Sequence, residues 1–309
     1  RAANIEGRQP SQAYVRPAIL LRTRPMRIAA VAVLAAACDV REGTLPSKDP
    51  VVMLKERPYA LDAPPDTTAP LPLLVVLHGQ GGRGTEIGED LDLRPLVATR
   101  NFWLAMPDGT ISRSGFSTWN AGTLDLPPYD RAYLAALIDD VAAKHPIDPK
   151  RVYVVGYSVG ALMAHRVACD ISPKIAAVMS FAGAVTSAAS LCTTTSPVSV
   201  VELHGDRDDV ITYDGGPFIG GVQSGPSAHD TVATWARNNA CAGPLRSTGV
   251  TLDIDPAVAG SETAIDAYDA CPKGIDVQLW TMHGTGHSPN LTPDFGTRVI
   301  DWLYAHPKP

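Results

Sequence analysis

The stretch Val152–Gly160, which reads VYVVGYSVG, decides the fold class of this 309-residue chain. Its first four residues are typical of a buried strand, and the glycines on either side of Ser158 predict a sharp turn. Apolar residues at helical spacing follow, among them Leu162 and Val167, so the turn leads directly into a helix. A serine at such a strand-to-helix turn presents its hydroxyl at the end of the strand. Ser158 is therefore the candidate nucleophile, with an ordinary tight turn as the alternative interpretation.

Strands and helices alternate on both sides of this stretch. One predicted helix carries Tyr133, Leu134, Leu137, Ile138 and Val141 on a single face. Alternation of this kind predicts a mostly parallel central sheet that is covered by helices on both faces. The predicted strands are Leu73–Leu77, Phe102–Met106, Val152–Val155, Ala176–Phe181, Val198–Leu203 and Val277–Trp280.

Two segments lack a regular apolar period and are predicted to be loops. The proline-rich segment Ala63–Pro72 is expected on the surface, where it joins early antiparallel strands to the main sheet. Gly215–Ser227 contains five glycines and is expected as a long loop near the carboxyl ends of the strands. Loops in that place commonly shape binding sites.

The composition is that of an ordinary globular protein, with 45% hydrophobic and 19% charged residues, which excludes a disordered or collagen-like chain. Residues 39–309 hold 20 basic and 31 acidic residues, and hence a formal charge of −11. An acidic body argues against nucleic acid or an anionic membrane surface as the main partner. We expect residues 39–309 to form a single catalytic domain.

The first 38 residues are expected to lie outside the fold. Residues 1–8 end in IEGR, which resembles a factor Xa cleavage site and is interpreted as the remnant of an engineered cleavage site. Residues 9–38 contain three closely spaced arginines, the apolar run Ile28–Ala37 and then Cys38, a pattern that predicts a bacterial export signal. Cys38 after three alanines fits a lipoprotein signal with a lipid anchor, and plain secretion is the alternative. The expected location is secreted, periplasmic or in the cell envelope, and no apolar stretch is long enough to span a membrane.

A nucleophilic serine needs a base, and the base needs an acidic group that orients it. The strand Val198–Leu203 is followed by HGDRDDV, in which Asp208 is the favoured acid and Asp206 the alternative. His287 follows a Gly-Thr-Gly turn after the last predicted strand and is the candidate base, whereas His283 at the strand end is interpreted as structural. The order Ser, Asp, His is that of the α/β-hydrolases. No role is assigned to the histidines without evident partners, His145, His165, His229 and His306.

The same chemistry requires two N–H donors for the oxyanion that forms in the transition state. Val159 supplies one donor from its backbone, because it directly follows the candidate nucleophile. The segment His78–Gly82, HGQGG, follows a predicted strand, and its glycines allow a close approach of the backbone to a substrate. We predict Gln80 N–H as the second donor. The loss of one such donor typically lowers turnover by roughly 100- to 1000-fold.

A series of short sequence motifs extends over most of the chain, from Pro58 to Leu303. They resemble those of secreted esterases of the poly(3-hydroxybutyrate) depolymerase and feruloyl esterase group. The resemblance implies an α/β-hydrolase fold without a large cap domain, Ser158, Asp208 and His287 as a catalytic triad, and Gln80 and Val159 as the oxyanion hole. The matching segments are Leu77–Gly79, Pro107–Gly109, Trp119–Gly122, Asp130–Leu134, Asp148–Met163, His204–Asp208, Trp235–Cys241 and Gly284–His287.

Four cysteines follow Cys38 and allow three disulfide pairings: Cys169, Cys192, Cys241 and Cys271. The export signal predicts an oxidising compartment, in which two bridges are expected. We favour the sequential pairing, Cys169–Cys192 and Cys241–Cys271, and the family resemblance supports it. The spacing matches no zinc motif, and the predicted chemistry requires neither a metal nor an organic cofactor.

The leading functional prediction is a serine carboxylic-ester hydrolase that acts through an acyl-enzyme on small-molecule or polymeric esters. Feruloyl or acetyl esters on plant polysaccharide are the favoured substrates, and poly(3-hydroxybutyrate) or its oligomers are the alternative. A serine peptidase and a non-catalytic carbohydrate-binding protein are the alternatives from other classes. Trp119, Tyr157 and Ser288 are candidate substrate contacts, with a place in the core as the equal alternative for Trp119 and Tyr157. Ser288-Pro289 stands where related sequences often have an aromatic-proline pair, and this departure leaves the substrate open.

Overall fold

The computed structural model describes residues 47–122, 126–185, 191–218 and 224–309. The predicted cleavage remnant at 1–8, the predicted export signal at 9–38 and Cys38 lie outside the described residues. None of the helices in the described ranges is long and apolar enough to cross a membrane.

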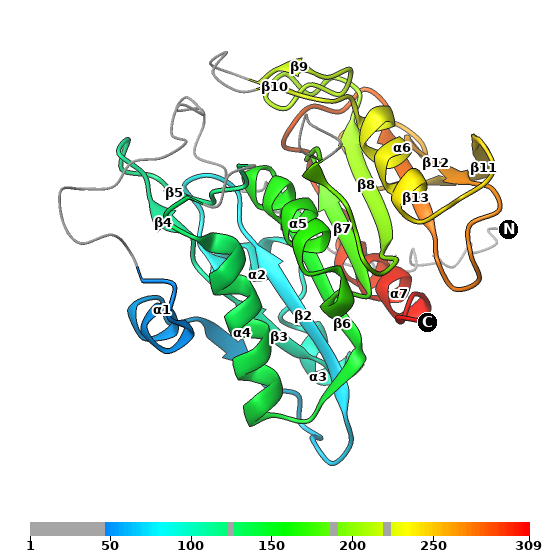
Figure 1. Ribbon diagram of the computed structural model, residues 1–309. Helices are drawn as coiled ribbons and strands as arrows, with labels where there is room; N and C mark the ends of the chain where they lie inside the picture. The colour runs from blue at the N-terminus through cyan, green and yellow to red at the C-terminus, as the bar shows by residue number, and fades with distance from the viewer. Residues whose placement is uncertain (1–46, 123–125, 186–190, 219–223) are drawn as a thin grey trace, which may run out of the picture.

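A central sheet dominates the described part of the chain (Figure 1). Its nine strands are β1 (Ala60–Asp62), β2 (Leu71–Leu77), β3 (Trp103–Met106), β6 (Ile147–Tyr157), β7 (Ala177–Phe181), β8 (Ser199–Gly205), β11 (Leu245–Leu252), β12 (Thr263–Tyr268) and β13 (Val277–Met282). They are hydrogen-bonded in the order β1-β3-β2-β6-β7-β8-β13-β12-β11. The six strands from β3 to β13 are parallel. At one edge β1 pairs antiparallel with β3, and at the other edge β12 pairs antiparallel with β13 and β11 pairs antiparallel with β12.

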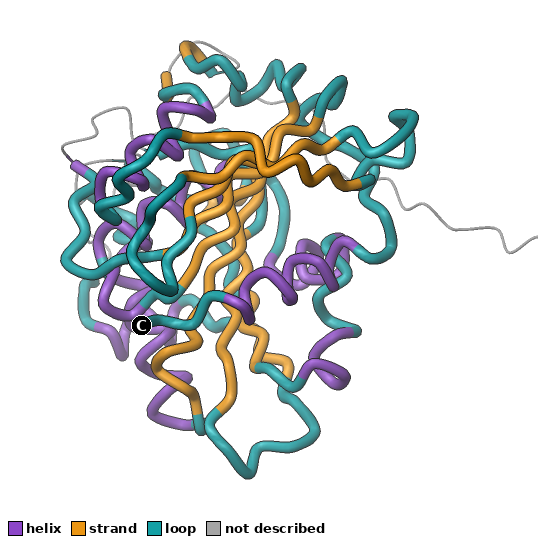
Figure 2. The backbone as a smooth tube through the Cα atoms, turned by 90° about the vertical axis from the view of Figure 1, so that its right-hand side faces the viewer, coloured by secondary structure: helices purple, strands orange, loops and turns teal. Residues whose placement is uncertain are grey.

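Helices cover both faces of the sheet, as the edge-on view in Figure 2 shows. On one face lie α1 (Pro50–Glu56), α4 (Asp130–Lys144), α5 (Val159–Asp170) and α6 (Ala228–Asn238); on the other lie α2 (Gly84–Asp90), α3 (Leu96–Arg100) and α7 (Phe295–Ala305). Each face has its own apolar core, because the side chains of a strand alternate between the two faces. The apolar face predicted for α4 is buried from Tyr133 to Val141.

The predicted sheet is confirmed in its centre and is larger than predicted at one edge. All six predicted strands are present, as β2, β3, β6, β7, β8 and β13. The two outer strands β11 and β12 were not predicted, because β11 is exposed along most of its length and carries no apolar pattern. The expected loop Gly215–Ser227 contains a short hairpin of β9 (Gly216–Pro217) and β10 (Ser224–Gly225). A second hairpin joins β4 (Thr110–Ile111) to β5 (Ser117–Thr118).

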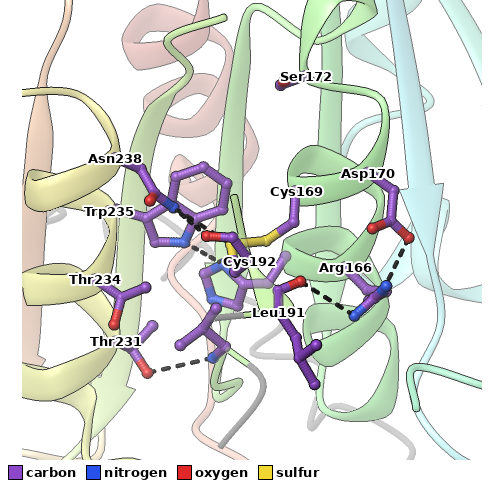
Figure 3. Close-up of a disulfide and its surroundings, with 12 residues drawn as sticks. Arg166, Cys169, Asp170, Ser172, Leu191, Cys192, Thr231, Thr234, Trp235 and Asn238 are labelled. Carbon is purple, nitrogen blue, oxygen red and sulfur yellow. Dashed lines mark hydrogen bonds and ion pairs between the residues drawn. A yellow bond between two sulfur atoms is a disulfide. The ribbon is translucent and has the colours of Figure 1, made fainter. Parts of the chain in front are cut away.

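Two disulfides with the sequential pairing are present, Cys169–Cys192 and Cys241–Cys271. The first ties α5 to the segment that precedes β8, and Figure 3 shows it between α5 and α6. Asn238 of α6 donates a 2.8 Å hydrogen bond to the Cys192 carbonyl, so side chains from α6 also hold this segment. Cys169 and Cys192 are buried, and the bridge is therefore part of the core beneath α5.

Removal of the Cys169–Cys192 bridge is expected to lower the free energy of unfolding by about 3 kcal/mol, because the bridge restricts the unfolded chain over a separation of 23 residues. Urea unfolding of the Cys169→Ser/Cys192→Ser variant, compared with the parent under oxidising conditions, measures this loss. A variant within about 0.5 kcal/mol of the parent would contradict the expectation.

Candidate active site

Ser158 lies at the turn between β6 and α5, in a backbone conformation that non-glycine residues rarely adopt. Its φ is 56° and its ψ is −123°. A non-glycine residue in this region is strained, and such strain persists only where the surrounding structure holds it. Here the Ser158 N–H donates to the Phe181 carbonyl of β7 at 2.9 Å, which fixes the turn to the neighbouring strand.

Both glycines of the turn are required by close backbone approaches. A Cβ atom on Gly156 would lie 2.2 Å from the Gly160 carbonyl oxygen, and one on Gly160 would lie 2.3 Å from the Leu77 carbonyl oxygen. No side chain fits at these distances without movement of the backbone. The glycine spacing around Ser158 is therefore a packing requirement of the turn between β6 and α5.

Gly160→Ala is expected to destabilise the fold by roughly 1–3 kcal/mol, because the new methyl group forces the start of α5 away from the end of β2. We also expect hydrolysis to fall at least tenfold, since the same shift moves Ser158. Urea unfolding and steady-state kinetics measure the two effects. Full activity and stability in this variant would contradict the tight packing at residue 160.

Ser158, His287 and Asp208 form a continuous hydrogen-bonded chain. Ser158 Oγ lies 2.9 Å from His287 Nε2, and His287 Nδ1 lies 2.7 Å from Asp208 Oδ2. A carboxylate accepts hydrogen bonds, so Nδ1 carries the proton and Nε2 is free to accept from the serine hydroxyl. All three side chains are buried to more than nine-tenths. The arrangement is able to transfer the serine proton to the imidazole.

The loop after β8 holds Asp208 in a fixed orientation. Its Oδ1 accepts the backbone N–H groups of Val210 at 2.8 Å and Ile211 at 2.9 Å, which leaves Oδ2 directed toward His287. Burial opposes the charged form of Asp208, but hydrogen bonds from His204 and His287 outweigh it and hold the pKa of this carboxyl well below its usual value.

Asp206, the alternative acid, lies in a different place. Its Oδ2 is 2.9 Å from His283 Nδ1, and its Oδ1 accepts the Gly284 N–H at 2.7 Å. The His283 side chain is 61% exposed. Asp206 and His283 therefore form a surface pair that braces the last loop, and the acid that contacts His287 is Asp208.

The glycine-rich segment after β2 lies directly beside the serine. A Cβ atom on Gly79 would be 3.4 Å from Ser158 Cβ, so the backbone that continues into Gln80 passes close to Ser158. Val159 is the first residue of α5, and the first N–H groups of a helix have no partner within that helix. The positive end of the helix dipole adds a favourable field for negative charge at the same point.

The His78 ring connects the His78–Gly82 segment to Gly109 through hydrogen bonds. Its ring Nδ1 donates to the Gly79 carbonyl at 2.6 Å, and its Nε2 accepts the Gly109 N–H at 2.9 Å. Burial lowers the pKa of His78, and the neutral ring that results suits one donor and one acceptor nitrogen. The Trp119 indole N–H donates to the His78 carbonyl at 3.0 Å. The predicted oxyanion loop is thus held rigidly.

Two of the three candidate substrate contacts are buried. Trp119 and Tyr157 are 5% and 3% exposed. The Tyr157 hydroxyl is 3.1 Å from the His287 carbonyl and 3.0 Å from Ser288 Oγ, so this ring supports the histidine loop. Ser288 is exposed beside His287 and is the one of the three that faces solvent.

The two short hairpins flank the site (Figure 1). The Gly81 N–H donates to the Ser117 carbonyl at 2.7 Å, which connects β5 to the segment His78–Gly82. On the other side, Phe218 after β9 packs with Ala184 and Ile211, the residue whose N–H holds Asp208. The two hairpins therefore contact the segments that lie beside Ser158 and Asp208.

A buried acid and the partners of three histidines were not predicted from the sequence. Glu202 on β8 is fully buried and contacts both His165 and His204. The expectation that His165 has no partner is wrong, and His229 and His306 also have partners, Tyr213 and the Trp302 carbonyl. The available signal was a glutamate inside an otherwise apolar strand.

Within the described ranges, no group of three or more His, Cys, Asp and Glu side chains is placed to hold a metal ion.

Comparisons with known proteins agree with this geometry. The Phospholipase/Carboxylesterase family model matches residues 130–217, which include the turn at Ser158 and the loop at Asp208. A solved acetyl xylan esterase from Aspergillus awamori superposes with a TM-score of 0.58 over 80% of this chain and 93% of its own, at 16% identity, a likeness that establishes the fold. The fold of the chain is that of the α/β-hydrolases, and residues 130–217 are similar to the Phospholipase/Carboxylesterase family.

Two curated relatives are similar to this chain in sequence. NocK of Nocardia uniformis subsp. tsuyamanensis, provisionally assigned as an esterase, is 28% identical over 81% of this chain and 75% of its own length. Feruloyl esterase B of Piromyces equi is 26% identical over 70% of this chain, which spans 39% of that enzyme. Within the described residues, this chain has helices on both faces of its sheet and no separate cap domain over the site.

Proposed function

We propose that this chain hydrolyses carboxylic esters through an acyl-enzyme on Ser158. The observation that carries the proposal is the buried chain of contacts from Ser158 Oγ through His287 to Asp208, with distances of 2.9 and 2.7 Å. The strained turn at Ser158 and the adjacent glycine segment supply the other parts that this chemistry needs.

The reaction follows from the direction of the hydrogen bonds. Ser158 Oγ attacks the ester carbonyl carbon while His287 Nε2 takes the hydroxyl proton. The N–H groups of Gln80 and Val159 stabilise the negative charge on the carbonyl oxygen. Collapse of the tetrahedral intermediate breaks the ester C–O bond, and His287 donates its proton to the leaving alcohol. Water then attacks the acyl-enzyme with His287 as its base, which releases the acid and restores Ser158.

Feruloyl or acetyl esters of plant polysaccharide are the substrates that we propose. The family resemblance of the motifs and the names of the relatives support this class, and the exposed Ser288 offers one hydrogen-bonding group at the rim. The alternative is hydrolysis of hydroxybutyrate oligomers by the same catalytic residues, to which the motif resemblance applies equally.

Turnover of a substrate panel tests this function. The panel contains nitrophenyl acetate, methyl ferulate, acetylated xylan, hydroxybutyrate trimer and a peptide anilide of matched size. We expect turnover of the acetyl and feruloyl esters and no cleavage of the anilide. Turnover of the trimer alone would move the substrate to polyesters, whereas cleavage of the anilide alone would replace the esterase with a peptidase.

We further propose that the chain works in an oxidising compartment outside the cytoplasm. The two disulfides support this location, because such bridges persist in oxidising surroundings. The export signal at residues 9–38 fits the same location, and lipidation of Cys38 as against plain secretion is decided by the mass of the mature protein from a native host.

A further inference from the structure

A buried chain of polar side chains runs from α6 to the catalytic acid. The Trp235 indole N–H of α6 donates to His165 Nδ1 at 3.0 Å. Because indole nitrogen is only a donor, His165 must be unprotonated at Nδ1 and carry its proton on Nε2. That nitrogen lies 2.9 Å from Glu202 Oε2, to which it donates.

Glu202 and His204 form the next link in this chain. Glu202 Oε1 accepts the Gly183 N–H at 3.0 Å and lies 2.9 Å from His204 Nδ1. Glu202 is fully buried and His204 is 1% exposed, so neither is solvated. A carboxylate in this position needs hydrogen-bond donors, and His165, Gly183 and His204 are placed to supply them.

Both ring nitrogens of His204 face acceptors. Nδ1 faces Glu202, and Nε2 lies 2.7 Å from the Ile211 carbonyl oxygen and 3.2 Å from Asp208 Oδ2. A carbonyl and a carboxylate cannot donate, so each nitrogen must carry a proton for its contacts to be satisfied. His204 is therefore an imidazolium with a carboxylate on either side.

The electrostatics of the site agree with this assignment. Burial alone would lower the pKa of His204, but its hydrogen bonds to Asp208 and Glu202 outweigh burial and raise the pKa to about 10. Burial likewise opposes ionisation of Glu202, and the hydrogen bonds from His165 and His204 lower its pKa below the usual value. The other titratable groups nearby are Tyr213, whose ring meets His204 edge-on, and His287 beyond Asp208.

We propose that His204, held as an imidazolium by Glu202, is a positioning residue that orients the Asp208 carboxylate and weakens its attraction for the protonated form of His287. The inference rests on the proposed function of the triad. Asp208 Oδ2 receives both His287 Nδ1 and His204 Nε2, and the positive charge behind it offsets part of its own negative charge. The two histidines share one oxygen.

The consequence is a shift in the pH dependence of catalysis. The acid limb of kcat/KM reports protonation of the catalytic base in the free enzyme. A nearby positive charge disfavours that protonation. His204 contacts Asp208 directly and Glu202 lies behind His204, so loss of the pair removes more positive than negative influence on His287 and moves the limb to higher pH. Glu202→Gln/His204→Gln removes both buried charges, keeps side chains that can hydrogen-bond, and leaves no unpaired ion in the core.

In this double variant we expect the acid limb of kcat/KM to move up by about 1 pH unit, and kcat on the plateau to fall about tenfold with little change in KM. The matched control is Asp206→Asn/His283→Gln, which removes an exposed His–Asp pair from the segments that follow β8 and β13. We expect no shift in the control. An unshifted limb in a folded Glu202→Gln/His204→Gln enzyme would overturn the proposal, because a purely structural role would lower stability alone.

A second measurement does not depend on activity or on the folding of a variant. In the parent labelled with ¹⁵N-histidine, we expect one buried ring to carry protons on both nitrogens at pH 8. The signal is assigned to His204 by contacts between its ring N–H protons and the protons of Glu202 and Ile211. A neutral His204 ring at that pH would overturn the proposal.

The two hypotheses fail in different ways. Ester hydrolysis that persists in Ser158→Ala would remove the proposed function, whereas Ser158-dependent hydrolysis with an unshifted acid limb would remove the role of His204 alone. The ¹⁵N signals report the charge of His204 in either case.

Discussion

Ser158→Ala is expected to lower kcat for ester hydrolysis by a factor of about 10⁴ or more. The variant has no atom that can form the acyl-enzyme, and His287 Nε2 loses its 2.9 Å contact with the hydroxyl. The residual rate comes from the N–H donors beside residue 158, which still stabilise the oxyanion for attack by water. Because alanine is smaller than serine and fits the same turn, stability is expected to change little. Steady-state kinetics with nitrophenyl acetate measure the loss.

A matched control distinguishes the nucleophile from a neighbouring hydroxyl. Ser288 is exposed next to His287, and its Oγ contacts the Tyr157 hydroxyl. We expect Ser288→Ala to change kcat by less than about tenfold, because it removes one contact at the rim and no reacting atom. A Ser158→Ala enzyme that keeps more than a tenth of the parental kcat would rule out Ser158 as the nucleophile.

Asp208→Asn is expected to lower kcat by roughly 10⁴-fold. The amide can donate to His287 Nδ1, which would place the imidazole proton on Nε2 and leave no acceptor for the serine hydroxyl. The substitution also removes the negative charge that stabilises the imidazolium formed during attack. Measurement of kcat and KM on the same ester separates this effect from a loss of binding, since KM is expected to change little.

Asp206→Asn provides the comparison for this second prediction. Asp206 contacts His283 and the Gly284 N–H at the surface, away from His287. We expect a change of less than about threefold in kcat, together with a small loss of stability. If Asp206→Asn lowered kcat more than Asp208→Asn, the carboxylate that orients His287 would be Asp206, which would contradict the assignment of Asp208.

The central sheet was predictable from sequence, because its parallel strands are buried on both faces and are nearly continuous apolar runs. β11 was not predictable, since it is an exposed edge strand whose residues face water along most of its length. The hairpin of β9 and β10 was missed for a similar reason, as each strand has two residues and neither carries a pattern. Burial is what produces a readable period, and these elements have little of it.

The placement of Ser158, His287 and Asp208 was predictable because each follows a predicted strand at the same edge of the sheet. The surroundings of these residues were harder to predict. For Trp119 and Tyr157 the sequence left a substrate contact and a core position open, and both side chains are buried. The sequence alone does not distinguish an aromatic residue that lines a pocket from one that packs beneath it. The pairing of Glu202 with His165 and His204 depends on contacts between β8, α5 and the loop after β8, which sequence spacing does not reveal.

Covalent labelling tests the central claim most directly. The intact protein is treated with diethyl p-nitrophenyl phosphate, which phosphorylates an activated serine and leaves a stable adduct in place of the acyl-enzyme. We predict one equivalent of nitrophenol released, one diethylphosphoryl group per chain, and its location on Ser158 by peptide mass spectrometry, with no adduct in Ser158→Ala or His287→Ala. An adduct on another residue, or equal labelling of Ser158→Ala, would contradict the account.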